Sequence, residues 1–573
     1  MPLTSTPATP YRMSPAHRRV FIGLMLGMFV ASVSQTIVGP AMPRIVAELG
    51  GMDHYSWVAT AAMLVSAVTV PIVGKLSDLY GRRAFYLGGI AVFLVGTLVC
   101  GLTPNFWTLV AGRALQGVGM GTLMPLSQTI IGDIIPARQR GKYQGLMGAV
   151  FGVTSVAGPI AGGFITDHWG WRWLFFAALP VSLIALFFIV KFLDLPFQRR
   201  RAKIDVAGIV VLTVTLTAIL LATSLGGTSY AWGSPLILTM FGVGLAGLVA
   251  FVAIERRAEE PVIPLRLFNS GIFSWSVLAA FAVSMIMFGA IIYIPIYAQA
   301  VIGVNATNSG LILMPLMLGL IVMGILTGML ITRTGLYKPF MVAGVTITGV
   351  GVWLLTLLDH TSSAAELTMI MVVVGVGLGM CMQQYTLVVQ NDANGRDMGV
   401  ATAATQFFRN VGSTVGIAIF GSLMTLGLSR AILGYLPADV QASLPADGGI
   451  DVGSVLDPGQ LDGLPPVIVD AVRQGLADRL HVVFTVMLPI VALALIATLM
   501  IKVIPLRETL APASPAADDA TTTDDAPPVD SPAAGVPAGP DSPARRDQPV
   551  SARARSAAQG AGGAAADSDQ SRP

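Results

Sequence analysis

The sequence predicts an all-α polytopic membrane protein with fourteen transmembrane helices. Of its 573 residues, 54% are hydrophobic and only 11% are charged, whereas soluble domains carry about 25% charged residues. Fourteen apolar runs reach the length of about 20 residues that is needed to cross the hydrocarbon core of a bilayer. The histidines are scattered, and Cys100 and Cys381 lie in distant apolar runs. We therefore expect no metal, no cofactor and no disulfide.

Short polar connections join the predicted helices. The first run is too long for the apolar region of a signal peptide, so we expect it to be retained as a helix. Residues 1–19 precede it. In chain order, the predicted spans are 20–43, 56–76, 84–103, 107–131, 142–166, 172–194, 204–226, 234–254, 272–300, 308–331, 339–358, 366–390, 399–428 and 480–503.

The distribution of Lys and Arg predicts the orientation of the chain in the cell membrane. Twenty of these residues lie in the N-terminus and the even-numbered connections, against five on the opposite side. Because cytoplasmic loops carry the excess of positive charge, both termini should be cytoplasmic. Residues 431–478 should form an extracellular loop that ends in an amphipathic stretch, 467–480. Residues 508–573 have almost no large apolar side chains and should be a disordered cytoplasmic tail.

A charged hairpin separates the second and third spans. Each Asp, Lys or Arg at the centre of a bilayer costs about 2.5–3.5 kcal/mol, so this hairpin must lie just outside the hydrocarbon. Its glycines and charged residues are Gly74, Lys75, Asp78, Gly81, Arg82 and Arg83.

This hairpin has a second copy further along the chain. Gly74-x6-Gly81 recurs as Gly328-x6-Gly335, with Thr332 in place of Asp78. The repeat pairs the second span with the tenth. It predicts a six-helix bundle at 20–194, a second at 272–503 and two linker helices at 204–254 between them.

Two further patterns lie inside predicted helices. The Arg113 side chain in the fourth span costs free energy in the membrane unless its guanidinium meets a partner or water. Alternatively, the side chain snorkels to the outer interface and only anchors the helix. The fifth span carries small residues that allow close helix approach. Ordinary packing between helices would be enough to explain them. These residues are Gly158, Pro159, Gly162 and Gly163.

These patterns together resemble one family of transporters. The hairpin is similar to the GxLxDxxGRR signature of the major facilitator superfamily, and Arg113-x2-Gln116-Gly117-x-Gly119 resembles its helix-4 motif. Gly158-Pro159-x2-Gly162-Gly163 resembles the motif of its exporters. Residues 33–43 resemble the LDxTIVxxALP motif of the fourteen-helix drug:proton antiporters. Further matches lie at 56–61, 171–173, 204–208, 295–303 and 399–412.

The resemblance implies a major facilitator fold and a function. It implies two six-helix bundles plus two extra central helices, and multidrug efflux coupled to proton antiport. The hairpin residues would then control gating, and Arg113 and Asp78 would take part in proton coupling. One departure affects this expectation: Ser34 stands where the family usually has an aspartate. Because Ser cannot titrate, protons act through Asp78 and the surroundings of Arg113, or coupling differs from the family pattern.

The candidate substrate cavity is polar but uncharged. Met and aromatic side chains can repack around varied apolar ligands, but about half of these residues could instead be interhelical hydrogen bonds or core. The candidates are Ser34, Gln35, Gln116, Tyr293, Tyr297, Gln299, Met382, Gln383, Gln384, Tyr385 and Gln406. Arg409 either attracts an anionic head group or caps the cytoplasmic end of its helix.

Three functions remain open. No P-loop is present to bind ATP and no nucleophile–base pair is evident, so we expect a gradient-driven transporter and not an enzyme. The first is an efflux pump for hydrophobic drugs; the second exports an endogenous lipid or secreted metabolite with non-standard coupling. The third is a membrane scaffold or sensor that does not transport. The expected partners are small hydrophobic molecules, protons and the lipid bilayer, without nucleic acid, and the chain should be a monomer.

Overall fold

A computed structural model describes residues 13–50, 57–194, 203–226, 230–304, 306–437 and 465–508. These residues are almost entirely helical, and no extended strand occurs among them. The predicted tail, apart from Glu508, lies outside the described residues, as does the middle of the predicted loop, residues 438–464.

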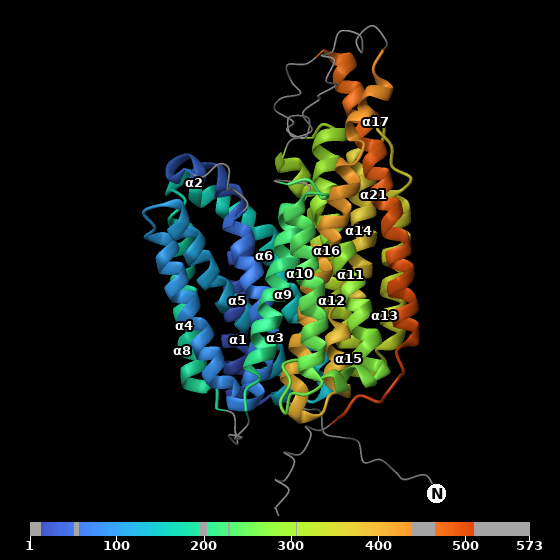
Figure 1. Ribbon diagram of the computed structural model, residues 1–573. Helices are drawn as coiled ribbons and strands as arrows, with labels where there is room; N and C mark the ends of the chain where they lie inside the picture. Colours follow the sequence, from blue (N-terminus) through green and yellow to red (C-terminus); the bar gives the residue numbers. More distant parts are fainter. Residues whose placement is uncertain are drawn as a thin grey trace, which may run out of the picture. The chain divides into compact units, whose positions relative to one another are not determined.

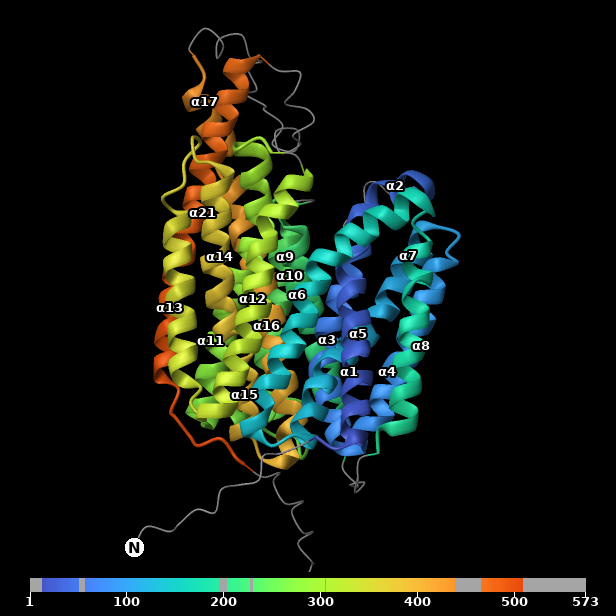
Figure 2. The same ribbon diagram turned by 180° about the vertical axis from the view of Figure 1, so that it is seen from behind.

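The N-terminal half, blue to teal in Figures 1 and 2, contains six long helical segments. The first connection contains a short helix, η1 (Gly39–Ala41), followed by α2 (Met42–Leu49). The long segments are α1 (Pro15–Thr36), α3 (Trp57–Tyr80), α4 (Arg82–Gly101), α5 (Phe106–Ile134), α6 (Ala137–His168) and the sixth, which is divided into α7 (Trp173–Phe176) and α8 (Ala178–Phe192). Buried apolar side chains of α1, α4, α5 and α8 form a core within this half.

Two helices follow before the second half begins. They are α9 (Val206–Leu225) and α10 (Pro235–Glu255), and each begins at a side chain that accepts a hydrogen bond from its first turn, Asp205 and Ser234 respectively. Such caps satisfy backbone N–H groups that have no partner inside the helix. A short helix, η3 (Leu265–Asn269), leads into the second half.

The C-terminal half has its own buried core. Its elements are α11 (Gly271–Ile296) with the π-helical turn η4 (Tyr297–Val301), α12 (Ala306–Thr334), α13 (Lys338–Leu355), α14 (Ala364–Cys381), α15 (Gln384–Asp392), η5 (Gly395–Asp397), α16 (Met398–Thr425), α17 (Leu428–Tyr435) and α21 (Pro466–Met500). Helices α6 and α12 lie side by side, so they join the two halves (Figure 2).

The predicted all-α membrane fold is confirmed. Thirteen of the described helical segments are long and apolar enough to span a membrane. Helix α5 is the remaining predicted span: its 29 residues cover about 43 Å at 1.5 Å per residue. It carries Arg113, Gln116, Gln128 and Asp133, which lower its hydropathy.

Several boundaries differ from the prediction, among them those of the first helix and of the predicted extracellular loop. Helix α1 begins at Pro15 and not at residue 20, because the Ser14 side chain accepts a hydrogen bond from His17 N and proline fits the first turn. The predicted loop at 431–478 is helical at both described ends, in α17 and the first part of α21. Helix α17 packs on α21, where the Tyr435 hydroxyl donates to Asp478 at 2.7 Å.

Candidate functional site

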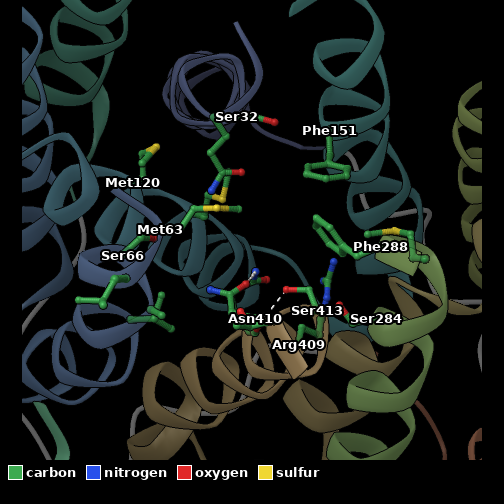
Figure 3. Close-up of a pocket in the computed structure, with 18 of the residues that line it drawn as sticks. Ser32, Met63, Ser66, Met120, Phe151, Ser284, Phe288, Arg409, Asn410 and Ser413 are labelled. Atoms are coloured by element: carbon green, nitrogen blue, oxygen red, sulfur yellow. Dashed lines mark hydrogen bonds between the residues drawn. The ribbon is translucent and has the colours of Figure 1, made fainter. Parts of the chain in front are cut away.

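A cavity of about 270 Å³ lies between the two halves (Figure 3). Its lining residues come from α1, α3, α5 and α6 of the first half, from α9, and from α11 and α16 of the second. Gln383, at the start of α15, also lines it. The cavity is therefore built from both halves and one linker helix.

Soft apolar side chains form much of the cavity wall. The lining methionines are Met28, Met63, Met120, Met124, Met147 and Met287, and the lining phenylalanines are Phe151 and Phe288. None of these methionines was predicted from the sequence to line the cavity. A signal was present, because Met120 and Met124 are four residues apart and so share one helix face.

Polar groups gather on one face of α16. Gln406, Arg409, Asn410 and Ser413 line the cavity there, at spacings of three and four residues that keep them on one side of the helix. The Gln406 amide donates to Asn410 Oδ1 at 3.1 Å, and Ser413 Oγ donates to the Asn410 carbonyl at 2.8 Å. No carboxylate is among the residues that line the described cavity.

Three of the predicted cavity residues line this cavity: Gln35, Gln383 and Gln406. The others lie elsewhere, mostly in contacts between helices. Tyr293 donates to the Ile417 carbonyl, Tyr297 to the Asp359 carbonyl and Gln299 to Ser309, and the Tyr385 and Thr498 hydroxyls are hydrogen-bonded. Gln384 and Met382 are buried, and Ser34 and Gln116 both contact Arg113.

Arg113 is buried, with 2% of its surface exposed, which contradicts an anchor that snorkels to the interface. Its Nη1 donates to Gln116 Oε1 at 2.7 Å and to both Ser34 Oγ and the Ser34 carbonyl at 3.1 Å. Its Nε donates to the Val58 carbonyl at 3.1 Å. The guanidinium thus meets neutral oxygens from three helices. It has no ion-pair partner among the described residues, and Ser34 occupies the position from which an acid would meet it.

The charged hairpin ties the two halves together. Asp78 forms an ion pair with Arg82 at 2.7 Å, and its carboxylate accepts hydrogen bonds from the backbone N–H groups of Gly399 and Val400 at 3.2 and 2.8 Å. These two N–H groups belong to the first turn of α16, whose unsatisfied donors and dipole favour a negative charge. We call this end of the bundle the Asp78 end.

Glycine allows that contact. A Cβ at Gly74 would collide with Ala403 and lie 3.2 Å from the Gly399 carbonyl oxygen, so a larger residue would push α16 away from α3. Gly81 has φ +101° at the turn between α3 and α4, a conformation that side-chain-bearing residues rarely adopt.

Several partners of the hairpin were missed from the sequence. Asp133 at the end of α5 pairs with Arg82, and Glu260, which follows α10, pairs with Lys75 at 2.5 Å. Arg83 donates to the Val190 carbonyl at 2.8 Å. Gln390 of the second half donates to the Gln128 carbonyl of α5 at 3.0 Å. Of these partners, only Asp133 could be singled out from the sequence, because it is a carboxylate close to the end of the predicted span 107–131.

The glycine motif of α6 packs against the end of α1. A Cβ at Gly158 would collide with Thr36, and one at Gly162 would collide with the Ile37 carbonyl. The Thr36 hydroxyl donates to the Thr154 carbonyl at 3.0 Å. Pro159 lies inside the helix, whereas a Cβ at Gly163 would meet nothing within 4 Å. Gly158 and Gly162 therefore set the α1–α6 distance.

Comparison with known proteins places the chain among membrane transporters. Residues 24–417 match the family model of the Major Facilitator Superfamily. The chain is 37% identical to the multidrug transporter protein MdtP of Bacillus subtilis over 502 residues, which is 84% of this chain and 93% of that protein. It is 33% identical to multidrug resistance protein 3 of Bacillus subtilis over 479 residues, 83% of this chain and 93% of that protein.

Solved structures with the same fold have low sequence identity. The human organic anion transporter MFSD10 has a TM-score of 0.53 at 15% identity, over 83% of this chain and all of that chain (100%). The proton:xylose symporter XylE has a TM-score of 0.53 at 14% identity, over 72% of this chain and 89% of that chain. At these identities the likeness shows the fold alone.

Proposed function

Because the chain belongs to the Major Facilitator Superfamily, we propose that it is a secondary active exporter of hydrophobic or amphiphilic small molecules that works by alternating access. The cavity between the halves carries this proposal. Its wall combines methionine and phenylalanine with neutral amides and hydroxyls, which suits apolar ligands of varied shape. Similarity to two Bacillus proteins named for multidrug transport and resistance supports export as the direction.

The gate in this proposal is the contact of Asp78 with the first turn of α16. Each half contributes part of the cavity wall, so a rocking motion of one half against the other would change access to the cavity. Such motion must break the hydrogen bonds from Gly399 and Val400 to Asp78. The described conformation, with these bonds formed, would be the one closed at the Asp78 end.

The excess of Lys and Arg in the N-terminus and the even-numbered connections supports a cytoplasmic Asp78 end, with both termini in the cytoplasm of the cell membrane. Export would then release substrate at the opposite end. The protein would act as a monomer driven by an ion gradient, without ATP.

Proton antiport would act through Asp78 in this scheme. The described cavity is lined by no carboxylate, and Arg113 already meets neutral acceptors. Protonation of Asp78 would weaken its ion pair with Arg82 and its bonds to α16 together, which would release the gate.

Transport in inside-out vesicles tests the proposal. Vesicles that contain the protein should accumulate a lipophilic dye faster than matched empty vesicles, and an imposed pH gradient should increase that rate. Equal accumulation in both would contradict export, and a non-transporting scaffold would then be favoured. Export that does not respond to the pH gradient would contradict proton antiport alone.

A further inference from the structure

Arg409 is the only ionisable side chain among the residues that line the described cavity. It lies eleven residues after Met398, the first residue of α16, which is about 16 Å along the helix at 1.5 Å per residue. This depth places it near the middle of the 28-residue helix. A role as a cap of the helix end is therefore excluded.

Arg409 differs in its partners from the other arginines inside the helix bundle. Arg113 donates to neutral oxygens from three helices, Arg82 pairs with two carboxylates, and Arg140 donates to the Ile135 carbonyl at 2.7 Å. The Nη1 atom of Arg409 is buried and has no hydrogen-bond partner among the described residues, and no described carboxylate pairs with it. An uncompensated cation at this depth is costly, and such residues mark substrate or ion sites.

The surroundings of Arg409 are amphipathic. Figure 3 shows Arg409 beside Asn410, Ser413 and Ser284 on one side of the cavity, while Met63, Met120 and Phe151 lie across from them. A ligand that satisfies both sides needs an anionic oxygen at one end and an apolar body at the other. A lipophilic cation would meet repulsion from Arg409 and no opposing carboxylate.

We propose that Arg409 is the head-group site for an anionic amphiphile, with a carboxylate or phosphate at the guanidinium and an apolar chain among the methionines. A guanidinium can donate two parallel hydrogen bonds to either oxyanion. Neutral donors nearby, the Asn410 amide and the Ser284 hydroxyl, add hydrogen-bonding capacity at the same wall. This assignment deepens the exporter proposed above and rests on it for transport, although binding can be measured without transport.

The test is binding of matched probes to the full-length protein in nanodiscs of neutral lipid. The probes are a fluorescent long-chain carboxylic acid, its methyl ester and the primary amine with the same chain and fluorophore. A fluorescent lysophosphatidate serves as the phosphate arm and separates a lipid head group from a simple carboxylate. The wild-type protein should bind at least one of the two acids about tenfold or more tightly than the ester and the amine, the scale of one hydrogen bond to a charged group.

The variant Arg409→Gln should lose this preference while it still binds the methyl ester, and Arg409→Lys should retain part of it because the charge remains. Arg257→Gln, which removes an exposed arginine outside the cavity, is the matched control and should change nothing. Equal binding of acid, ester and amine by the wild-type protein would overturn the assignment, and this measurement does not depend on the folding of any variant. A preference that survives Arg409→Gln would also overturn it. Binding that depends on Arg409 in a protein that exports nothing would refute the proposed function alone.

Discussion

The carboxylate of Asp78 in α3 accepts a hydrogen bond from the backbone N–H of Val400 in α16, at 2.8 Å and across 322 residues of sequence. The same carboxylate pairs with Arg82, which in turn pairs with Asp133. A chain of alternating charges thus ends on the first turn of a helix from the other half. Because a helix N-terminus favours a nearby anion, this contact holds the two halves together at one end.

Replacement of Asp78 by Asn should abolish efflux and leave membrane insertion intact. Asn keeps the shape but loses the charge, and a hydrogen bond to a charged group contributes about 1.5–3 kcal/mol. The measurement is dye efflux at equal protein levels in the membrane. Asp194→Asn is the control, because Asp194 is 95% exposed and lies 3.8 Å from Arg83. Undiminished efflux by the Asp78 variant would contradict the proposed role of Asp78 as part of the gate.

Gly158→Leu should impair folding, whereas Gly163→Leu should be tolerated. The two glycines lie in the same helix, but a side chain at Gly158 collides with Thr36 and one at Gly163 meets open space. Overpacking of this kind costs about 1–3 kcal/mol. Thermal unfolding of the purified proteins in detergent compares them. Equal melting temperatures would show that α1 and α6 can separate without cost.

Ser34→Asp should change the pH dependence of efflux and favour cationic substrates. Ser34 Oγ lies 3.1 Å from Arg113 Nη1, so a carboxylate there would pair with the guanidinium, which offsets part of the cost of its burial. Neighbouring Gln35 lines the cavity. The check is efflux against external pH for both proteins, with one cationic and one neutral dye. Identical pH profiles and an unchanged dye preference would show that position 34 takes no part in proton coupling.

Glu48 should stabilise the protein at neutral pH but not in acid. Hydrogen bonds from Arg172 and Trp171 hold the pKa of Glu48, in α2 outside the membrane-spanning segments, below its ordinary value of 4.5. The folded state therefore favours the ionised form, and this stabilisation is complete above about pH 4.5 and is lost as pH falls through the lowered pKa. Glu48→Gln should lower the melting temperature at pH 7. A loss of equal size in strong acid would show that the charge is not responsible.

Deletion of residues 509–573 should preserve insertion and efflux. The segment lacks the large apolar side chains that a folded core requires. The cut keeps Glu508, which pairs with Arg138 at the start of α6. A truncated protein that inserts normally but no longer exports would reveal a function of the tail.

The membrane helices were predictable because hydropathy is a local property. The spans around α4 and α10 depend only on about 20 consecutive apolar residues, and each lies within a few residues of its predicted position. The sequence likewise singled out Asp78, Arg113 and Gly158. A charged side chain in a membrane helix costs free energy, and a glycine there allows another helix to approach closely.

The partners of these residues were not predictable from local sequence. A membrane helix is apolar on its lipid face and on its packed face, so periodicity does not tell which residues face a cavity. Tyr385 and Gln406 were equal candidates from sequence, yet Tyr385 bonds to Thr498 and Gln406 lines the cavity. The rotation of each helix about its axis decides between these outcomes.

That rotation depends on packing between segments far apart in the chain. Gly399 and Val400 meet Asp78 because Gly74 lets α16 approach α3, and Arg409 of the same helix lines the cavity. Local composition therefore determines which segments enter the membrane and which residues cost free energy when they are placed there. The contacts between the halves determine which of those residues face each other, because such contacts arise only when the helices are packed.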